Sequence, residues 1–238
     1  MSKLQIALLI FPRMTQLDMT GPFEVFARIP DAKVHLVWKT AEPVVSDVGL
    51  TVMPTTTCAQ CPQADIICIP GGPGQIDLME DREIIDFVRR QGEGARYVTS
   101  VCTGALVLGA AGLLRGYKAA THWASMDNLE HFGAIPTKTR VCVDRNRITG
   151  GGVTAGIDFG LVVASHVTDR TTAEKIQLYM EYNPEPPFAA GSPDTAPADV
   201  LAAFQEMAKP MLTRRKEVTL RVAAQMHDPA GKVSGRSG

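Results

Sequence analysis

The stretch that decides the fold is Arg96-Tyr-Val-Thr-Ser-Val-Cys-Thr-Gly-Ala-Leu-Val-Leu-Gly-Ala-Ala-Gly-Leu-Leu114. Residues 97–101 form a short apolar run typical of a buried strand, and from Thr103 onward small and apolar residues recur at helical spacing. Cys102 therefore stands at a strand-to-helix turn without a linker. Such a turn exposes the side chain, and the unpaired amides of a helix N-terminus favour a thiolate. Two interpretations stay open here, a nucleophile or a buried structural cysteine.

Strand and helix patterns alternate on both sides of this junction. We expect strands at residues 5–10, 34–38, 65–69, 139–143 and 147–150, and a short hairpin or edge segment at 43–53 with Gly49 at its bend. We expect a first helix that starts at Thr20 and Pro22, and others at 81–91 and after Trp123 up to about 132. Later helices are expected after the glycines at 150–152 up to about 167, from a capping box at 171–174, and at 199–224, where Pro210 kinks or splits the helix. This alternation predicts an α/β fold with a mostly parallel sheet and helices on both faces.

The domain organisation follows from the same pattern. Residues 1–183 form the α/β domain, and residues 184–226 form a Pro/Gly-rich loop and a helical extension of it. Residues 227–238 are expected to be a disordered tail.

Three further chain segments lie where the strands end. Asp18 follows the first strand, in the loop just before the first helix, and 70-Pro-Gly-Gly-Pro-Gly-74 ends the third strand. Gly150, Gly151 and Gly152 end a later strand and open a second strand–glycine–helix junction. The carboxyl ends of parallel strands meet at one edge of the sheet, where α/β proteins build their sites. Taken alone, Asp18 is more often a turn or cap residue.

Composition excludes several classes of protein. The 238 residues are 45% hydrophobic with a formal net charge of −1, which supports a sizeable core and argues against nucleic acid as a main partner. The run Arg214-Arg215-Lys216 is interpreted as a solvated helix face. No signal peptide or membrane span is evident, and five cysteines favour a reduced, cytoplasmic setting.

Other candidate motifs are weaker. Cys58 and Cys61 have metal-ligand spacing but no second pair, and Cys68 and Cys142 fall within strands. His122 is either the base of a Cys–His pair or a hydrogen-bonding core histidine beside Trp123. The glycine run at 70–74 has neither the ending of a phosphate loop nor a dinucleotide fingerprint.

These segments together resemble the ThiJ/PfpI superfamily, which has a flavodoxin-like (glutamine-amidotransferase-like) fold. The resemblance rests on Asp65–Gly74, Ser100–Ala105 and Thr121–Trp123. Residues 16–22, 98–104, 150–158 and 190–197 look more closely like the isocyanide hydratase branch.

The resemblance implies roles for individual residues. Cys102 would be the nucleophile at a nucleophile elbow, Asp18 the acid and base, and the amides of Gly72 and Thr103 the oxyanion hole or water-orienting groups. His122, Gly151 and Val153 would support the site. Aspartate at position 18 departs from the glutamate common in the superfamily and agrees with the hydratase branch. Thr103 replaces the histidine of peptidase-like members, which argues against peptidase activity.

The activity so implied is cofactor-independent, metal-free hydration of a small uncharged isocyanide to an N-substituted formamide through a Cys102 thioimidate. A cytoplasmic homodimer that binds neither membrane nor nucleic acid is implied as well. Two alternatives remain: a glyoxalase-type enzyme that uses Cys102, and a non-catalytic redox or ligand sensor in which Cys102 is oxidised.

Overall fold

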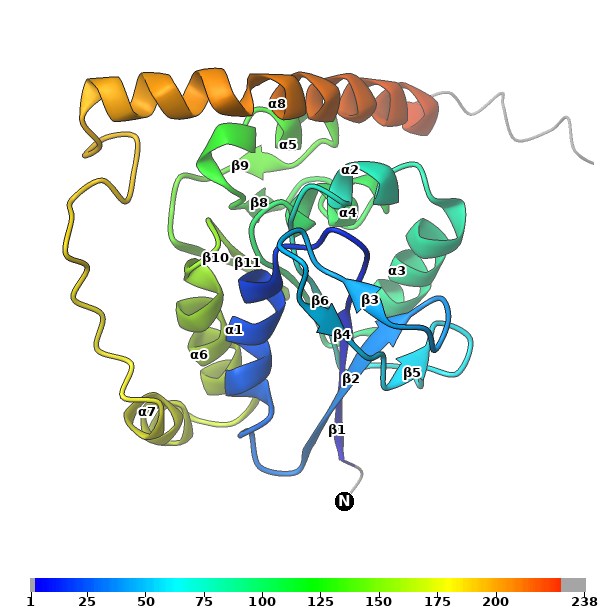
Figure 1. The fold of residues 1–238 in the computed structure, drawn as a ribbon. Helices are drawn as coiled ribbons and strands as arrows, with labels where there is room; N and C mark the ends of the chain where they lie inside the picture. The colour runs from blue at the N-terminus through cyan, green and yellow to red at the C-terminus, as the bar shows by residue number, and fades with distance from the viewer. Residues whose placement is uncertain (1–2, 228–238) are drawn as a thin grey trace, which may run out of the picture.

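The structure, a computed structural model, describes residues 3–227. It contains a seven-stranded sheet in the order β10-β11-β7-β6-β1-β2-β5 (Figure 1). Neighbouring strands are parallel except for the β10–β11 pair. The strands are β1 (Leu4–Leu9), β2 (Ala32–Trp38), β5 (Thr56–Thr57), β6 (Ile66–Ile69), β7 (Tyr97–Ser100), β10 (Val141–Asp144) and β11 (Arg147–Gly150). The predicted α/β, flavodoxin-like class is confirmed.

Two small sheets complete the strands. β3 (Val44–Val45) and β4 (Thr51–Val52) form the predicted hairpin, and Gly49 takes a φ of 89° in its turn. A residue with a side chain rarely adopts that conformation, so glycine is required there. β8 (Lys118–Ala119) pairs with β9 (Ile135–Pro136) beyond the main sheet.

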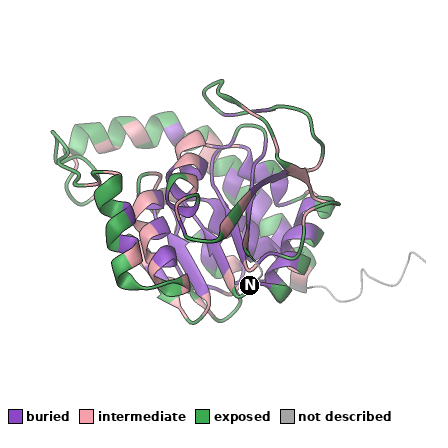
Figure 2. Cartoon of the chain, turned by 90° about the horizontal axis from the view of Figure 1, so that it is seen from below, coloured by how far each residue is buried: buried purple, intermediate pink, exposed green. Residues whose placement is uncertain are grey.

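Helices cover both faces of the sheet. On one face α1 (Gln16–Phe26) packs against α6 (Ala155–Val167), and on the other α3 (Arg82–Gly94) packs against α4 (Gly104–Ala110). The strands between them are buried, and the outer helix faces are exposed (Figure 2). Phe26 and Phe159 meet edge to face at 6.1 Å between α1 and α6. The remaining helices are α2 (Gln75–Leu78), the 3-10 helix η1 (Trp123–Ser125), α5 (Asn128–His131), α7 (Arg170–Tyr179) and α8 (Ala198–His227).

The start of the first helix corrects the sequence prediction. α1 begins at Gln16, so Asp18 lies in its first turn and not in a preceding loop. Pro22 sits inside the helix, where it has no N–H to donate to the carbonyl of Asp18 four residues earlier. Thr20 and Pro22 predict a helix start, but the helix begins earlier, with Thr15 at the N-cap position.

Two other helix predictions were partly wrong. Asp169, not Thr171, caps α7 by accepting a hydrogen bond from the Thr172 amide at 2.9 Å. The helix expected after Trp123 is divided into η1 and α5.

The C-terminal helix α8 lies across the ends of α2, α4 and α5 (Figure 1). It continues through Pro210 without splitting, and it includes His227, so the predicted tail does not begin at that residue. The rest of the predicted tail, 228–238, lies outside the described residues. Over residues 3–227, no helix is long and apolar enough to cross a membrane.

Candidate active site

Cys102 occupies a tight turn between β7 and α4. Its φ is 53°, a left-handed backbone conformation that is uncommon for a residue with a side chain and is typical of strained functional turns. The turn is held from two sides. The Cys102 amide donates to the Gly150 carbonyl at 3.2 Å, and the Thr121 hydroxyl donates to the Cys102 carbonyl at 2.8 Å. The predicted strand–cysteine–helix junction is therefore present, and the second glycine junction is hydrogen-bonded to it.

Asp18 lies beside this turn and is completely buried. Its Oδ2 accepts a hydrogen bond from the Gly71 amide at 2.9 Å. Its Oδ1 is buried without a hydrogen-bond partner of good geometry among residues 3–227. Burial raises the pKa of Asp18 to about 7, although contact with the Cys102 thiol and the Gly71 amide partly offsets the rise. Near neutral pH this carboxyl is thus able both to donate and to accept a proton.

Gly71 is a site residue that the sequence analysis missed. A Cβ at this position would lie 2.6 Å from the Thr103 amide nitrogen and 2.7 Å from Asp18 Oδ2. Only glycine fits there, and its amide holds the carboxyl. The available signal was the glycine run itself, but it did not indicate which of the two amides binds Asp18.

The amides of Gly72 and Thr103 are placed differently from each other. The Gly72 amide donates to the Thr103 hydroxyl at 3.1 Å, so an oxyanion role for Gly72 requires that this hydroxyl first move away. The Thr103 amide acts on the Cys102 sulfur and lowers the pKa of that thiol. The loop after β6 and the start of α4 are therefore joined at the site.

The electrostatics of Cys102 differ from the sequence expectation. Burial, followed by the charge of Asp18, raises the pKa of the thiol well above its ordinary value, and the Thr103 amide only partly counters this. Cys102 is only 5% exposed, which explains why burial outweighs the helix N-terminus. Because one negative charge on this pair disfavours a second, Cys102 and Asp18 act as a coupled pair that readily carries a single negative charge.

His122 does not form a Cys–His pair in this structure. Its Nδ1 accepts a hydrogen bond from the Ala124 amide at 3.3 Å and caps η1. The ring stacks on Trp123 with centroids 5.6 Å apart, and burial lowers the pKa of His122. No hydrogen bond joins it to Cys102 within residues 3–227. These contacts support the interpretation of His122 as a hydrogen-bonding structural histidine.

Gly151 and Val153 continue the glycine-rich turn after β11. The Gly151 amide donates to the Arg140 carbonyl at 2.9 Å, and the Val153 carbonyl accepts from the Gly156 amide at 3.2 Å. Val153 is partly buried against the core. The structure places the turn beside Cys102 through Gly150 and gives neither residue a polar contact with the thiol.

Arg215 does not lie on a solvated helix face, so that sequence prediction is wrong for this residue. It is only 3% exposed and points from α8 into the molecule. The sequence indicates this burial through helical spacing. Val218, Thr219 and Val222, at the third, fourth and seventh positions after Arg215, lie on the same helix face and are also buried.

The other cysteines carry no site. Cys58 and Cys61 are half-buried and free, and burial raises the pKa of each thiol to about 11. Cys68 and Cys142 are buried, as predicted for strand residues. Among the described residues, no three His, Cys, Asp or Glu side chains are grouped so that they could hold a metal ion.

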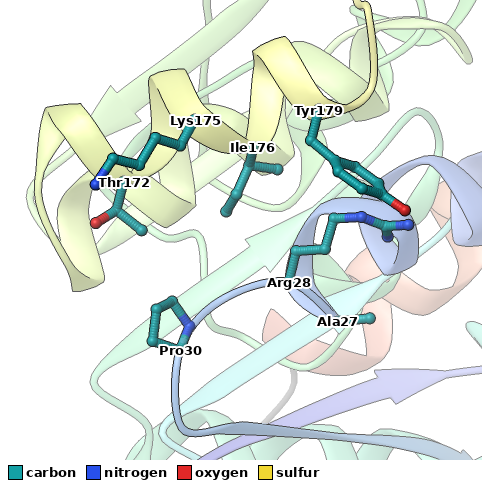
Figure 3. Close-up of a pocket in the computed structure, with 7 residues that line it drawn as sticks. All are labelled: Ala27, Arg28, Pro30, Thr172, Lys175, Ile176 and Tyr179. Atoms are coloured by element: carbon teal, nitrogen blue, oxygen red, sulfur yellow. The ribbon is translucent and has the colours of Figure 1, made fainter.

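A surface pocket of about 650 Å³ lies elsewhere, between the end of α1 and α7 (Figure 3). Arg28 stacks on the Tyr179 ring there, 4.4 Å from its centroid. The pocket is lined by Ala27, Arg28, Pro30, Thr172, Lys175, Ile176 and Tyr179. It contains none of the predicted site residues.

The chain is 55% identical over 224 residues to isonitrile hydratase of Pseudomonas putida, covering 94% of this chain and 98% of that one. It is 36% identical over 115 residues to the transcriptional regulator GbdR of Pseudomonas aeruginosa, covering 48% of this chain and 31% of the regulator.

Among solved structures, a ThiJ/PfpI family protein from Pseudomonas syringae superposes with a TM-score of 0.90 at 47% identity. The match covers 92% of this chain and 91% of that one. Residues 4–166 match the model of the DJ-1/PfpI family. The chain therefore belongs to the DJ-1/PfpI family.

Proposed function

We propose that this protein is an isonitrile (isocyanide) hydratase that converts R–N≡C and water into the formamide R–NH–CHO. The observation that carries the proposal is the near full-length match to isonitrile hydratase. The site geometry supports it, because a buried carboxyl with a pKa near 7 adjoins a cysteine at a strained turn. That match favours hydration over the glyoxalase and sensor alternatives.

The first half of the reaction forms a covalent intermediate. The terminal carbon of an isocyanide has a lone pair, so it needs both a nucleophile and a proton. The Cys102 thiolate attacks this carbon while protonated Asp18 transfers its proton to the same carbon. A C–S bond and a C–H bond form, and the product is a thioimidate, R–N=CH–S–Cys102.

The second half hydrolyses this intermediate. Asp18, now a carboxylate, takes a proton from water as the hydroxide adds to the carbon, and it passes that proton to the nitrogen. The tetrahedral species then loses its hydroxyl proton to Asp18 as the C–S bond breaks. Formamide is released, and Cys102 and Asp18 return to their starting states, so the step is balanced without a cofactor.

Backbone groups would assist these steps. The Thr103 amide acts on the sulfur and would stabilise the thiolate as it leaves. The Gly71 amide holds Asp18 Oδ2, which leaves Oδ1 as the oxygen that exchanges protons with substrate. The Gly72 amide would orient the water once the Thr103 hydroxyl has moved from it. His122, Gly151 and Val153 would form the neighbouring wall of the site.

Class, assembly and location complete the proposal. The reaction would make the protein a cofactor-independent carbon–nitrogen lyase. The family resemblance also implies a homodimer located in the cytoplasm. Light scattering on the purified protein would test the dimer through its mass.

The test measures the formamide that the purified protein produces from each of a panel of alkyl and aryl isocyanides, with chromatography as the assay. We expect Cys102→Ala to abolish turnover and Asp18→Asn to lower kcat at least about 100-fold. Cys61→Ala, at a half-buried free cysteine, is the matched control and should keep full activity. Absence of formamide with every isocyanide would refute the function, and full activity of Asp18→Asn would refute the acid–base role.

A further inference from the structure

Arg215 of α8 is a buried cation that has no part in the reaction steps proposed for Cys102 and Asp18. Its guanidinium Nε donates to Gln75 Oε1 at 3.1 Å, and its Nη1 donates to Ser125 Oγ at 3.1 Å. Its Nη2 contacts the sulfur of Met211 at 3.6 Å. All of these partners are neutral, and within residues 3–227 no carboxylate forms an ion pair with it.

A buried guanidinium without a counter-charge is expensive. Arginine does not lose its proton in proteins, so the charge cannot be removed by titration. Neutral hydrogen bonds recover only part of the lost hydration, and a buried charge normally has a charged partner. A negative charge close to Arg215 would therefore stabilise the protein.

The contacts of Arg215 lead to the site on two sides. Gln75 follows the glycine run, and its amide donates to the Gly72 carbonyl at 3.2 Å. Ser125 ends the turn that begins at His122, and its amide donates to the His122 carbonyl at 2.8 Å. Arg215 thus joins two turns that flank Cys102, although it is separated from Gln75 by 140 positions in the chain.

The Cys102–Asp18 pair is the candidate source of such a negative charge. The charged and titratable groups that face Cys102 are Asp18 from α1 and Arg215 from α8, together with the Thr103 amide dipole. Asp18 opposes the thiolate, whereas Arg215 favours it. Among residues 3–227, the charge of Cys102 is also the single ionic influence that favours the charged form of Arg215. Arg215 acts on His122 as well, lowering the pKa of that ring.

We propose that Arg215 is a positioning residue of the Cys102 site, which holds the Gly72–Gln75 and His122–Ser125 turns together and supplies the positive charge that balances the Cys102 thiolate. The C-terminal helix is then a working part of the active site. Phe204 of α8 packs against Trp123 with the two ring centroids 5.3 Å apart, which gives the helix a second contact beside the site. The inference rests on the proposed function for its role in turnover, but not for its effect on the thiol.

The test measures the pH dependence of Cys102 alkylation by iodoacetamide, with each cysteine resolved by peptide mass. In Arg215→Gln, which is neutral but still able to hydrogen-bond, we expect the apparent pKa of Cys102 to rise by about one unit. The alkylation rate at pH 7 should fall up to about tenfold. Arg215→Lys keeps the charge and should retain most of the wild-type profile.

Arg214→Gln is the matched control, because Arg214 is the exposed neighbour on α8 and pairs with Asp77 at 2.6 Å. It should leave the Cys102 profile unchanged. A folded Arg215→Gln protein with the wild-type profile would overturn the proposal, as would an equal shift in Arg214→Gln. If Arg215→Gln does not fold, a one-unit shift in folded Arg215→Lys overturns it. Because alkylation needs no isocyanide, a protein that produces no formamide refutes the hydratase proposal and leaves this one standing.

Discussion

Replacement of Asp18 by Asn should make the protein more stable above neutral pH while it removes activity. Asp18 is completely buried, and its pKa rises from 3.8 to about 7 on folding. A carboxyl whose pKa is raised in the folded state stabilises the fold when it is protonated. That contribution is full below pH 3.8 and is lost as the pH rises to 7. Asparagine does not ionise, and its oxygen can still accept from the Gly71 amide.

The magnitude follows from the size of the shift. Each pKa unit corresponds to about 1.4 kcal/mol, so the wild-type protein loses about 4 kcal/mol of unfolding free energy relative to Asp18→Asn above pH 7. This figure is an upper one, since the charge is shared with Cys102. Between pH 5 and pH 8 the advantage of the variant should grow by about 2.5 kcal/mol.

The assay is urea unfolding of wild type and Asp18→Asn at several pH values, under reducing conditions. Asp127→Asn, a change at an exposed aspartate, is the control and should show no such pH-dependent gain. A constant difference between wild type and Asp18→Asn from pH 5 to pH 8 would show that burial does not raise the Asp18 pKa, and the role of this group as an acid at neutral pH would fail with it.

Three further outcomes are expected. The kcat/KM for an isocyanide should rise as the pH passes about 7, because the reactive form of the Cys102–Asp18 pair, a thiolate with a protonated carboxyl, carries one negative charge and the pair gains that charge there; a profile that is level from pH 5 to pH 9 would contradict this. Gly71→Ala would place a Cβ 2.6 Å from the backbone amide nitrogen of Thr103 and should lower kcat about 100-fold. Gly191→Ala, whose Cβ would have no atom within 4 Å, is the control and should keep its activity. Equal activities of the two variants in a kinetic assay would argue against the close approach of Gly71 to Thr103. Phe159→Ala should lower the free energy of unfolding in urea by about 3–5 kcal/mol, because this side chain is fully buried. Phe188→Ala, at a side chain that is 80% exposed, should change it very little. Similar losses in the two variants would contradict the packing of Phe159 between α1 and α6.

Much of the fold could be read locally. The strand before Cys102, the helix after it and the hairpin at Gly49 all depend on the order of neighbouring residues, and each is present. The start of the first helix was predicted too late, because proline is common in the first turn of a helix but Pro22 lies in the second turn of this one. A cap or turn signal leaves a boundary open by a few residues when tertiary packing favours a longer helix.

The candidate site was predicted in its members more than in its connections. Cys102 and Asp18 were identified from their positions at strand ends and from the family resemblance. The amide that binds Asp18 belongs to Gly71 and not Gly72, and the Gly72 amide binds the Thr103 hydroxyl. Such pairings join residues 31 and 53 positions apart, so no local pattern can specify them.

By itself the sequence determined the alternation of the main strands and helices, the strand-to-helix turn at Cys102 and the placing of Asp18 near the same sheet edge. These properties follow from periodicity and from parallel strands ending together. Only the tertiary structure decided the charge balance of the site. Burial raises the pKa of both Cys102 and Asp18, and Arg215 reaches the site from a helix more than 100 positions later in the chain. Desolvation and Coulomb energy depend on what surrounds a group in space, and the surroundings of Cys102 exist only once α8 has packed against the domain.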